Sequence, residues 1–191
     1  MGTEKTYTES LKNHYETYYG VEGNKKNWTI GPAEKLHPDF YVLEIGPNPV
    51  HKHMWTYLTV GMSLDRQDDK LIELFIYSPR QSESLVELLT FHASFHRHSE
   101  FLGLHHTVNI GQPWLKDSRC DHGFISLPFI EGETLELFEY EGKITHCYWL
   151  IPITKEERAY KSQHGCEALE QLFEDQNLDY LNPDRACLLD M

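Results

Sequence analysis

Histidine is the residue type that first suggests chemistry in this sequence, with twelve copies among 191 residues. Five of them gather in one short segment: His92, His96, His98, His105 and His106. His92 and His96 stand four apart, so on a helix both rings would share one face, as in zinc peptidases. Those enzymes need a glutamate directly after the first histidine to activate the metal-bound water, and Ala93 stands there instead. We therefore expect no bound metal, although a non-catalytic site that adds His105 or Cys120 as a ligand stays open.

A thiol nucleophile is the second chemistry to consider. The four cysteines, Cys120, Cys147, Cys166 and Cys187, are scattered and form no CxxC pair. His122 lies close to Cys120 along the chain and His164 lies close to Cys166, but closeness in sequence is poor evidence for the contact that a catalytic base requires. The pattern favours reduced structural or surface thiols. A metal- or thiol-dependent hydrolase that uses the histidine cluster or Cys120 remains the alternative function.

The segments that would position these residues have clear local patterns. Thr8 to Tyr19 is helical in pattern and Gly20 is placed as its stop, while the polar loop VEGNKKNWTIGP that follows is predicted to be a hinge. Aromatic and β-branched residues predict strands from Phe40 to Ile45 and from Trp55 to Met62. A charged tip, Asp65 to Lys70, joins the second strand to a third that reads LIELFIY, which predicts a β-hairpin.

The second half of the chain adds helices and further strands. Ser82 is placed to cap a helix. Its apolar stripe is predicted from helical spacing to comprise Leu85, Leu88, Leu89, His92 and Phe95. Three more strands are predicted near residues 124–129, 135–140 and 144–151. Thr154 and Glu157 then form a capping box that opens a helix, which Gly165 interrupts.

This order of elements predicts the fold class. Strands in series joined by hairpins, with helices between and after them, predict an α+β fold: a mixed, largely antiparallel sheet with helices packed on it. A chain of 191 residues suits one sizeable core. We expect an N-terminal helix and loop in residues 1–30 and one domain in residues 31–191.

Charge and hydropathy restrict the partners. Seventeen basic against thirty acidic residues give a net charge of −13, which repels phosphate backbones and anionic lipids. We therefore expect a protein partner, of basic character, and neither nucleic acid nor membrane. No signal-peptide pattern and no run of about 20 apolar residues is present, so we expect a cytoplasmic protein. No phosphate-binding or dinucleotide fingerprint points to a cofactor.

Several written signatures occur in a fixed order: WTYLTVGMS, ELFIYSP, LVELLTFHASFHRHSEFLGLHHTVNIGQPW, FISLPFIEG and ITKEERAYKSQHGCEALEQLF. Together they resemble the Suppressor of fused family, in its single-domain bacterial type, from about Asp39 to about Leu188. Family members are known as protein-interaction domains in eukaryotic signalling and as immunity proteins beside bacterial polymorphic toxins. The resemblance therefore implies a non-enzymatic binding module, of an immunity type that sequesters or neutralises a partner protein such as a toxin.

The resemblance also implies where a partner would bind. In the eukaryotic relatives a ligand peptide is held by strand addition, and Tyr57 matches the family tyrosine within WTYLTVG. Asp65, Asp68 and Asp69 match the acidic character of the segment that follows. We expect these four residues to contact the partner, with an added strand beside the strand that carries Tyr57. Trp55 and Tyr57 would share one face of that strand.

Overall fold

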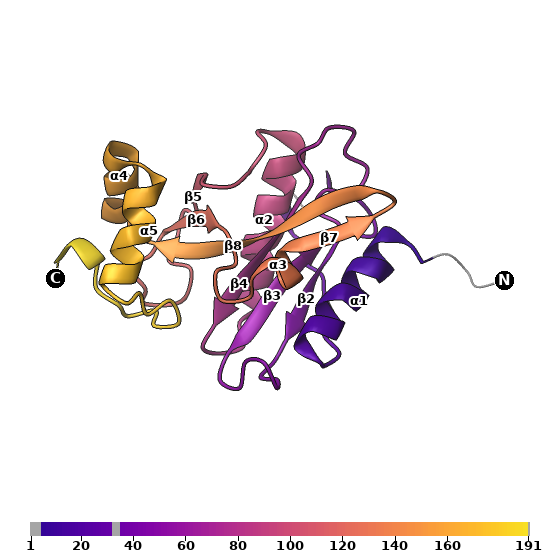
Figure 1. The fold of residues 1–191 in the computed structure, drawn as a ribbon, viewed down its shortest axis with the longest axis horizontal. Helices are drawn as coiled ribbons and strands as arrows, with labels where there is room; N and C mark the ends of the chain where they lie inside the picture. Colours follow the sequence, from indigo (N-terminus) through magenta and orange to yellow (C-terminus); the bar gives the residue numbers. More distant parts are fainter. Residues whose placement is uncertain (1–4, 32–34, 191) are drawn as a thin grey trace.

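A single sheet runs through the molecule in the computed structural model, which describes residues 5–31 and 35–190 (Figure 1). Within those residues the sheet has eight strands, in the order β1-β2-β3-β4-β8-β6-β5, with β7 paired to β8. The strands are β1 (Asn24–Lys26), β2 (Tyr41–Ile45), β3 (Trp55–Val60), β4 (Ile72–Ser78), β5 (Thr107–Asn109), β6 (His122–Ser126), β7 (Leu137–Tyr140) and β8 (Lys143–Ile153).

The strand pairing confirms the predicted mixed, largely antiparallel sheet. The predicted hairpin is β3 with β4, in a register that sets Trp55 opposite Ser78. One pair is parallel, β4 with β8, from Ile72 opposite His146 onward. The chain reaches β8 from β4 only after two helices and three more strands, and a parallel neighbour requires such a long crossover.

Helices cover both faces of the sheet. They are α1 (Tyr7–Tyr19), α2 (Glu83–His98), α3 (Glu133–Glu136), α4 (Lys155–His164) and α5 (Cys166–Asp175), followed by the short 3-10 helix Leu188–Asp190. Residues of α1 and α5 share one core cluster with Trp149 and Ile151 of β8. Residues of α2 share the other with Tyr148 and Leu150 of the same strand. Both faces of the central strands are buried, which explains their nearly continuous apolar sequences.

The N-terminal helix is part of the main core. Thr6 and Glu9 form a capping box at its start, and Gly20 ends it in the left-handed region with a φ of 69°, as the sequence predicted for that glycine. Leu11, Tyr15 and Tyr19 are fully buried in the cluster that contains the central strands. The predicted division at residue 30 therefore separates segments that share one core.

Four local expectations need correction. The loop predicted to be a hinge contains β1, which pairs with β2. Ser82 precedes α2 but makes no side-chain cap, because its hydroxyl bonds Ser84 instead. Phe95 is 42% exposed and lies off the buried stripe. The strand predicted over residues 135–140 begins as the short helix α3 and becomes extended only at Leu137.

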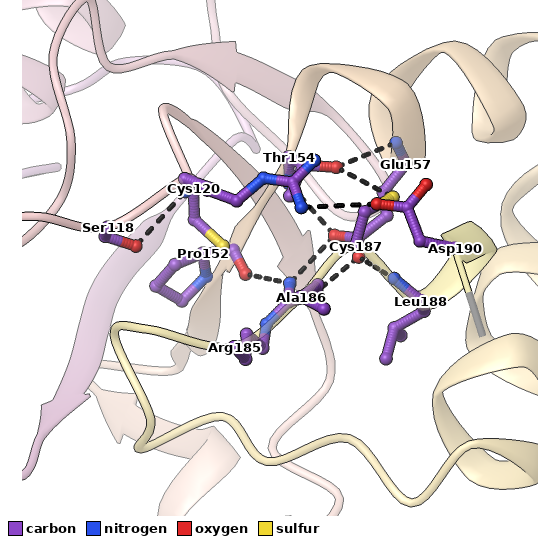
Figure 2. Close-up of polar contacts among 11 residues, drawn as sticks. Ser118, Cys120, Pro152, Thr154, Glu157, Arg185, Ala186, Cys187, Leu188 and Asp190 are labelled. Carbon is purple, nitrogen blue, oxygen red and sulfur yellow. Dashed lines mark hydrogen bonds and ion pairs between the residues drawn. The ribbon is translucent and has the colours of Figure 1, made fainter.

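A buried ion pair fixes the C-terminal segment to the body, and we call it the C-terminal lock (Figure 2). The guanidinium of Arg185 donates to both carboxylate oxygens of Glu157, at 2.7 and 2.8 Å, and to the carbonyl oxygen of Pro152 at 3.0 Å. The backbone N–H of Leu188 donates to the same carboxylate at 2.9 Å. Glu157 also completes the predicted capping box with Thr154 at the start of α4, so one side chain caps a helix and holds the C-terminal segment.

Candidate functional site

A groove of about 1060 Å³ lies between α2 and the edge strand β5. Its walls include Leu88, Phe91, His92 and Phe95 of α2, Phe101 of the following loop, Thr107, Val108 and Asn109 of β5, and Lys161 of α4. Because α2 and α4 lie on opposite faces of the sheet, the groove follows the sheet edge rather than either face. Its position depends on the tertiary arrangement of segments far apart in the sequence.

Three phenylalanines give the groove its apolar character. Phe91, Phe95 and Phe101 are 44%, 42% and 44% exposed, and all three line the groove. Phe91 and Phe95 are one helical turn apart on α2, so their rings lie on the same side of that helix. Clusters of large exposed apolar side chains in a concave surface mark interaction sites on soluble proteins.

The edge strand adds hydrogen-bonding groups to this apolar surface. β5 is the last strand of the sheet order and pairs with β6. The N–H of Ile110 donates to the carbonyl of Asp121, and the carbonyl of His106 accepts from Ile125. Backbone groups alternate in direction along a strand, so those of Thr107 and Asn109 point away from β6. This edge can accept an added strand.

A bulge shapes the start of this edge. The N–H of His105 donates to the carbonyl of Ile125 at 2.7 Å, while the N–H of Ile125 donates to the carbonyl of His106 at 2.9 Å. Two residues of one strand thus oppose one of the other, which defines a β-bulge. His105 has a φ of 65°, a region that side-chain-bearing residues adopt infrequently. Bulges of this kind increase the local twist beside functional sites.

The acidic tip, Asp65 to Lys70, lies at one end of the groove. The guanidinium of Arg66 donates to the carbonyl of His96 at 2.8 Å, which holds the tip against the end of α2. The ammonium of Lys70 lies 3.5 Å from the centre of the Phe101 ring. Asp65, Asp68 and Asp69 are exposed there. The three predicted aspartates therefore lie beside the groove.

Two of these aspartates already have a basic side chain as a neighbour. Arg66 donates to both oxygens of Asp68, at 2.9 and 2.5 Å, and these hydrogen bonds lower the pKa of that carboxyl. Asp65 lies 3.1 Å from the Nε2 atom of His37. Local pairing offsets part of the negative charge of the tip, since Arg66 and Lys70 belong to the same segment.

Tyr57 lies in the core, contrary to the expectation that it contacts a partner. Its side chain is fully buried, and its hydroxyl accepts a hydrogen bond from the N–H of Ser82 at 2.7 Å. β3 lies between β2 and β4, so the expectation of a free strand edge beside Tyr57 is wrong. Trp55 packs against the same core cluster. The shared face predicted for Trp55 and Tyr57 is directed toward the core.

Two histidines of the cluster, His92 and His96, bond to nearby backbone groups. The Nδ1 atom of His92 lies 2.7 Å from the carbonyl of Leu88. The Nδ1 atom of His96 accepts from the N–H of Leu102 at 2.8 Å, and burial lowers its pKa to about 4. Over residues 5–31 and 35–190, no group of three or more histidine, cysteine, aspartate or glutamate side chains is arranged to hold a metal ion.

Cys120 also lacks the surroundings of a nucleophile. Its side chain is buried, and burial raises the pKa of the thiol to about 11, so the reactive thiolate is scarce at neutral pH. The ring of His122 is held by Asp121, at 2.6 Å between Nδ1 and Oδ1. The described geometry therefore offers no support for the hydrolase alternative.

No pattern in the sequence indicates the groove as a unit. Phe95 fitted the apolar stripe by spacing, and Phe101 lies in a loop. β5 has only three residues, which is too short for a period-two pattern. The available hint is that Phe91 and Phe95 lie one helical turn apart.

Comparison with known proteins agrees with this architecture. The family model for Suppressor of fused protein (SUFU) matches residues 37–186. The crystal structure of a protein described as a SUFU homologue from Neisseria gonorrhoeae is 31% identical, covers 95% of this chain and 96% of its own, and superposes with a TM-score of 0.83. No curated protein sequence matches this chain.

Two more distant structures share the fold. The Sufu-Fu complex structure matches at 8% identity and a TM-score of 0.72, covering 96% of this chain and 93% of that chain. Drosophila Suppressor of Fused matches at 10% identity and a TM-score of 0.70, and this chain spans 51% of its length. No described helix has both the length and the apolar character needed to cross a bilayer. The family model and the Neisseria structure together establish that this chain belongs to the Suppressor of fused family.

Proposed function

We propose that this protein is a non-enzymatic binding module, of an immunity type, that sequesters a partner protein in the groove between α2 and β5. The observation that carries the proposal is the coincidence of three half-exposed phenylalanines with an edge strand in one concave surface. Apolar rings supply binding energy, and an open strand edge supplies directional hydrogen bonds.

The proposed mode of binding is addition of an extended partner segment to β5. The outward backbone groups of Thr107 and Asn109 would pair with the added strand. Alternate side chains of a strand point to opposite faces, so every second residue of the segment would face the rings of Phe91, Phe95 and Phe101. This mode differs from the one expected from the sequence, because β5 is an edge strand whereas β3 has a neighbour on each side.

Charge supports a basic partner. The net charge of −13 attracts cationic proteins over about 10 Å at moderate salt, and the acidic tip flanks the groove beside Phe101. A toxin that acts on nucleic acid is a protein of this kind, because contact with phosphates favours lysine and arginine. Neutralisation would then follow from covering the toxin surface or from holding it in an inactive complex.

The experiment begins with purification of the protein from its native host under mild conditions, followed by identification of the partner and binding kinetics with both proteins purified. The test variant is Phe91→Ser with Phe95→Ser. We expect it to weaken binding on the order of 30-fold, since buried aromatic anchors contribute about 2 kcal/mol or more. Thermal unfolding should change little, because both rings are already half exposed.

A matched control uses two exposed apolar residues outside the groove, Phe129 and Ile130, which are 58% and 45% exposed. Phe129→Ser with Ile130→Ser should bind with wild-type kinetics. Co-expression with the partner then tests immunity, because the groove variant should fail to protect cells that the wild-type protein protects. Wild-type binding by the groove variant would place the site elsewhere and overturn the proposal.

A further inference from the structure

The hairpin of β7 and β8, outside the groove, is another regular element with exposed apolar side chains. Its turn consists of Glu141 and Gly142, with φ values of 49° and 74°, and Tyr140 pairs with Lys143 across it. A two-residue turn with both φ values positive matches the right-handed twist of the strands that it joins. The hairpin is thus a well-specified element rather than an irregular loop.

One face of this hairpin is covered by α1. Phe138 is buried, and its ring lies 5.5 Å from that of Tyr7, edge to face. The ring of Tyr140 contacts Tyr7 at the same separation, 5.5 Å. Thr145, opposite Phe138, is also buried and lies 3.3 Å from the Tyr7 hydroxyl. The residues that alternate with these must point to the other face.

Four side chains lie on that other face, in two cross-strand pairs. Leu137 lies opposite His146, and Glu139 lies opposite Ile144. Residues directly opposite in an antiparallel pair share a face, and diagonal pairs are still within reach of long side chains. Leu137 is 39% exposed and Ile144 is 52% exposed. α2 packs over β2, β3 and β4 on this side of the sheet, which leaves the two aliphatic side chains open to solvent.

The charges around this face are nearly all negative. The segment from Glu133 to Lys143 contains four glutamates and one lysine. Glu139 and Glu141 are exposed, whereas Glu136 is held by the Nδ1 atom of His146 at 2.9 Å. An aliphatic pair with an acidic border is complementary to an amphipathic segment that carries lysine or arginine.

We propose that the outer face of the β7–β8 hairpin is a second docking surface, separate from the groove, for a basic amphipathic segment of a partner protein. Apolar side chains of the segment pack on Leu137 and Ile144, and its cationic side chains approach Glu139 and Glu141. Negative charge at the border disfavours an anionic lipid surface or a nucleic acid as the occupant.

The hairpin face adjoins the acidic tip. The N–H of His146 donates to the carbonyl of Leu71 at 3.0 Å, and Leu71 directly follows Lys70, whose ammonium contacts Phe101 at the groove. The acidic tip therefore lies between the groove and the hairpin face. A basic partner that engages both surfaces gains affinity through effective concentration.

The test uses a short synthetic peptide of alternating leucine and lysine as the probe, with a leucine and glutamate peptide of the same length as its charge-reversed control. Methyl-labelled protein is titrated and followed by NMR. We expect the lysine peptide to shift the methyl signals of Leu137 and Ile144, and the glutamate peptide to leave them unchanged. Leu137→Ser with Ile144→Ser should weaken the interaction on the order of tenfold.

Two further variants separate this surface from its alternatives. Glu139→Gln with Glu141→Gln should weaken the interaction about threefold at low salt, since each exposed charge contributes little. Phe129→Ser with Ile130→Ser, and Phe91→Ser with Phe95→Ser in the groove, should leave the Leu137 and Ile144 shifts unchanged. Three outcomes would each overturn the proposal. The glutamate peptide could cause equal shifts, or the Phe129 and Ile130 control could weaken the interaction equally. The third outcome is that about millimolar lysine peptide causes no shift.

Discussion

The C-terminal lock and the groove are opposites, because the lock has charged side chains in the interior and the groove has apolar side chains at the surface. The lock buries an arginine and a glutamate, each almost wholly removed from solvent, whereas the groove leaves three phenylalanines half exposed. In the lock, every charge has a hydrogen-bonded partner of opposite sign or a backbone group. In the groove, the apolar rings are not fully covered by the chain. Satisfied buried polar groups indicate structure, and uncovered apolar groups indicate binding.

The same contrast applies to the reactive residue types, cysteine and histidine. Cys120 lies beside the lock (Figure 2), where burial raises the pKa of its thiol. His92 lines the groove but is itself buried and bonded to a backbone carbonyl. Neither region concentrates reactive groups with access to solvent. The proposed function therefore rests on shape and exposed area rather than on chemistry.

The largest effect should come from breaking the lock. Arg185→Ala leaves the carboxylate of Glu157 buried without its partner, so we expect the free energy of unfolding to fall by about 3–5 kcal/mol. Denaturant unfolding measures this loss. Arg158→Ala, at an exposed position of α4, is the matched control and should change stability by about 0.5 kcal/mol or less. If both variants lose the same small amount, the ion pair does not stabilise the fold.

Acid should weaken the lock selectively. Burial alone would raise the pKa of Glu157, but hydrogen bonds and the positive charge of Arg185 outweigh it and hold the pKa below its ordinary value of 4.5. The unfolded chain thus takes up this proton at a higher pH than the folded protein. The stabilisation is present at neutral pH and is lost as the pH falls below 4.5 toward the pKa of the folded state.

Urea unfolding between about pH 7 and about pH 3 measures this dependence. Glu157→Gln removes the titrating group, so its stability should fall less steeply with acid than that of the wild type. Some slope should remain, because hydrogen bonds from His51, Tyr18 and Tyr77 outweigh burial and lower the pKa of Glu131 as well. Parallel pH profiles for the variant and the wild type would contradict the assignment.

The smallest effect should come from the acidic tip at the groove. Replacing Asp65, Asp68 and Asp69 with asparagine should slow association with a purified basic partner several-fold at low salt and flatten its salt dependence, with dissociation nearly unchanged. The matched control changes three exposed carboxylates near the C-terminus to amides: Glu167→Gln, Glu174→Gln and Asp179→Asn. Equal slowing by the control would mean that net charge, rather than the tip, steers the partner.

Local sequence patterns predicted much of the fold. Gly20 and Thr154 with Glu157 mark helix ends through contacts within a few residues, so their roles can be read without knowledge of the rest of the chain. The β3–β4 hairpin follows from two apolar runs joined by a charged tip. The parallel pairing of β4 with β8 could not be predicted in this way, because it joins residues more than seventy positions apart.

The candidate site shows the same division. The sequence by itself determined the α+β elements, the net charge of −13 and the motifs that resemble the Suppressor of fused family. Only the tertiary structure decided that Tyr57 is buried beneath α2 and that Phe91, Phe95 and Phe101 border an open strand edge. The physical reason is that the exposure of a side chain depends on which distant segments pack against it. Local periodicity does not indicate which segments those are.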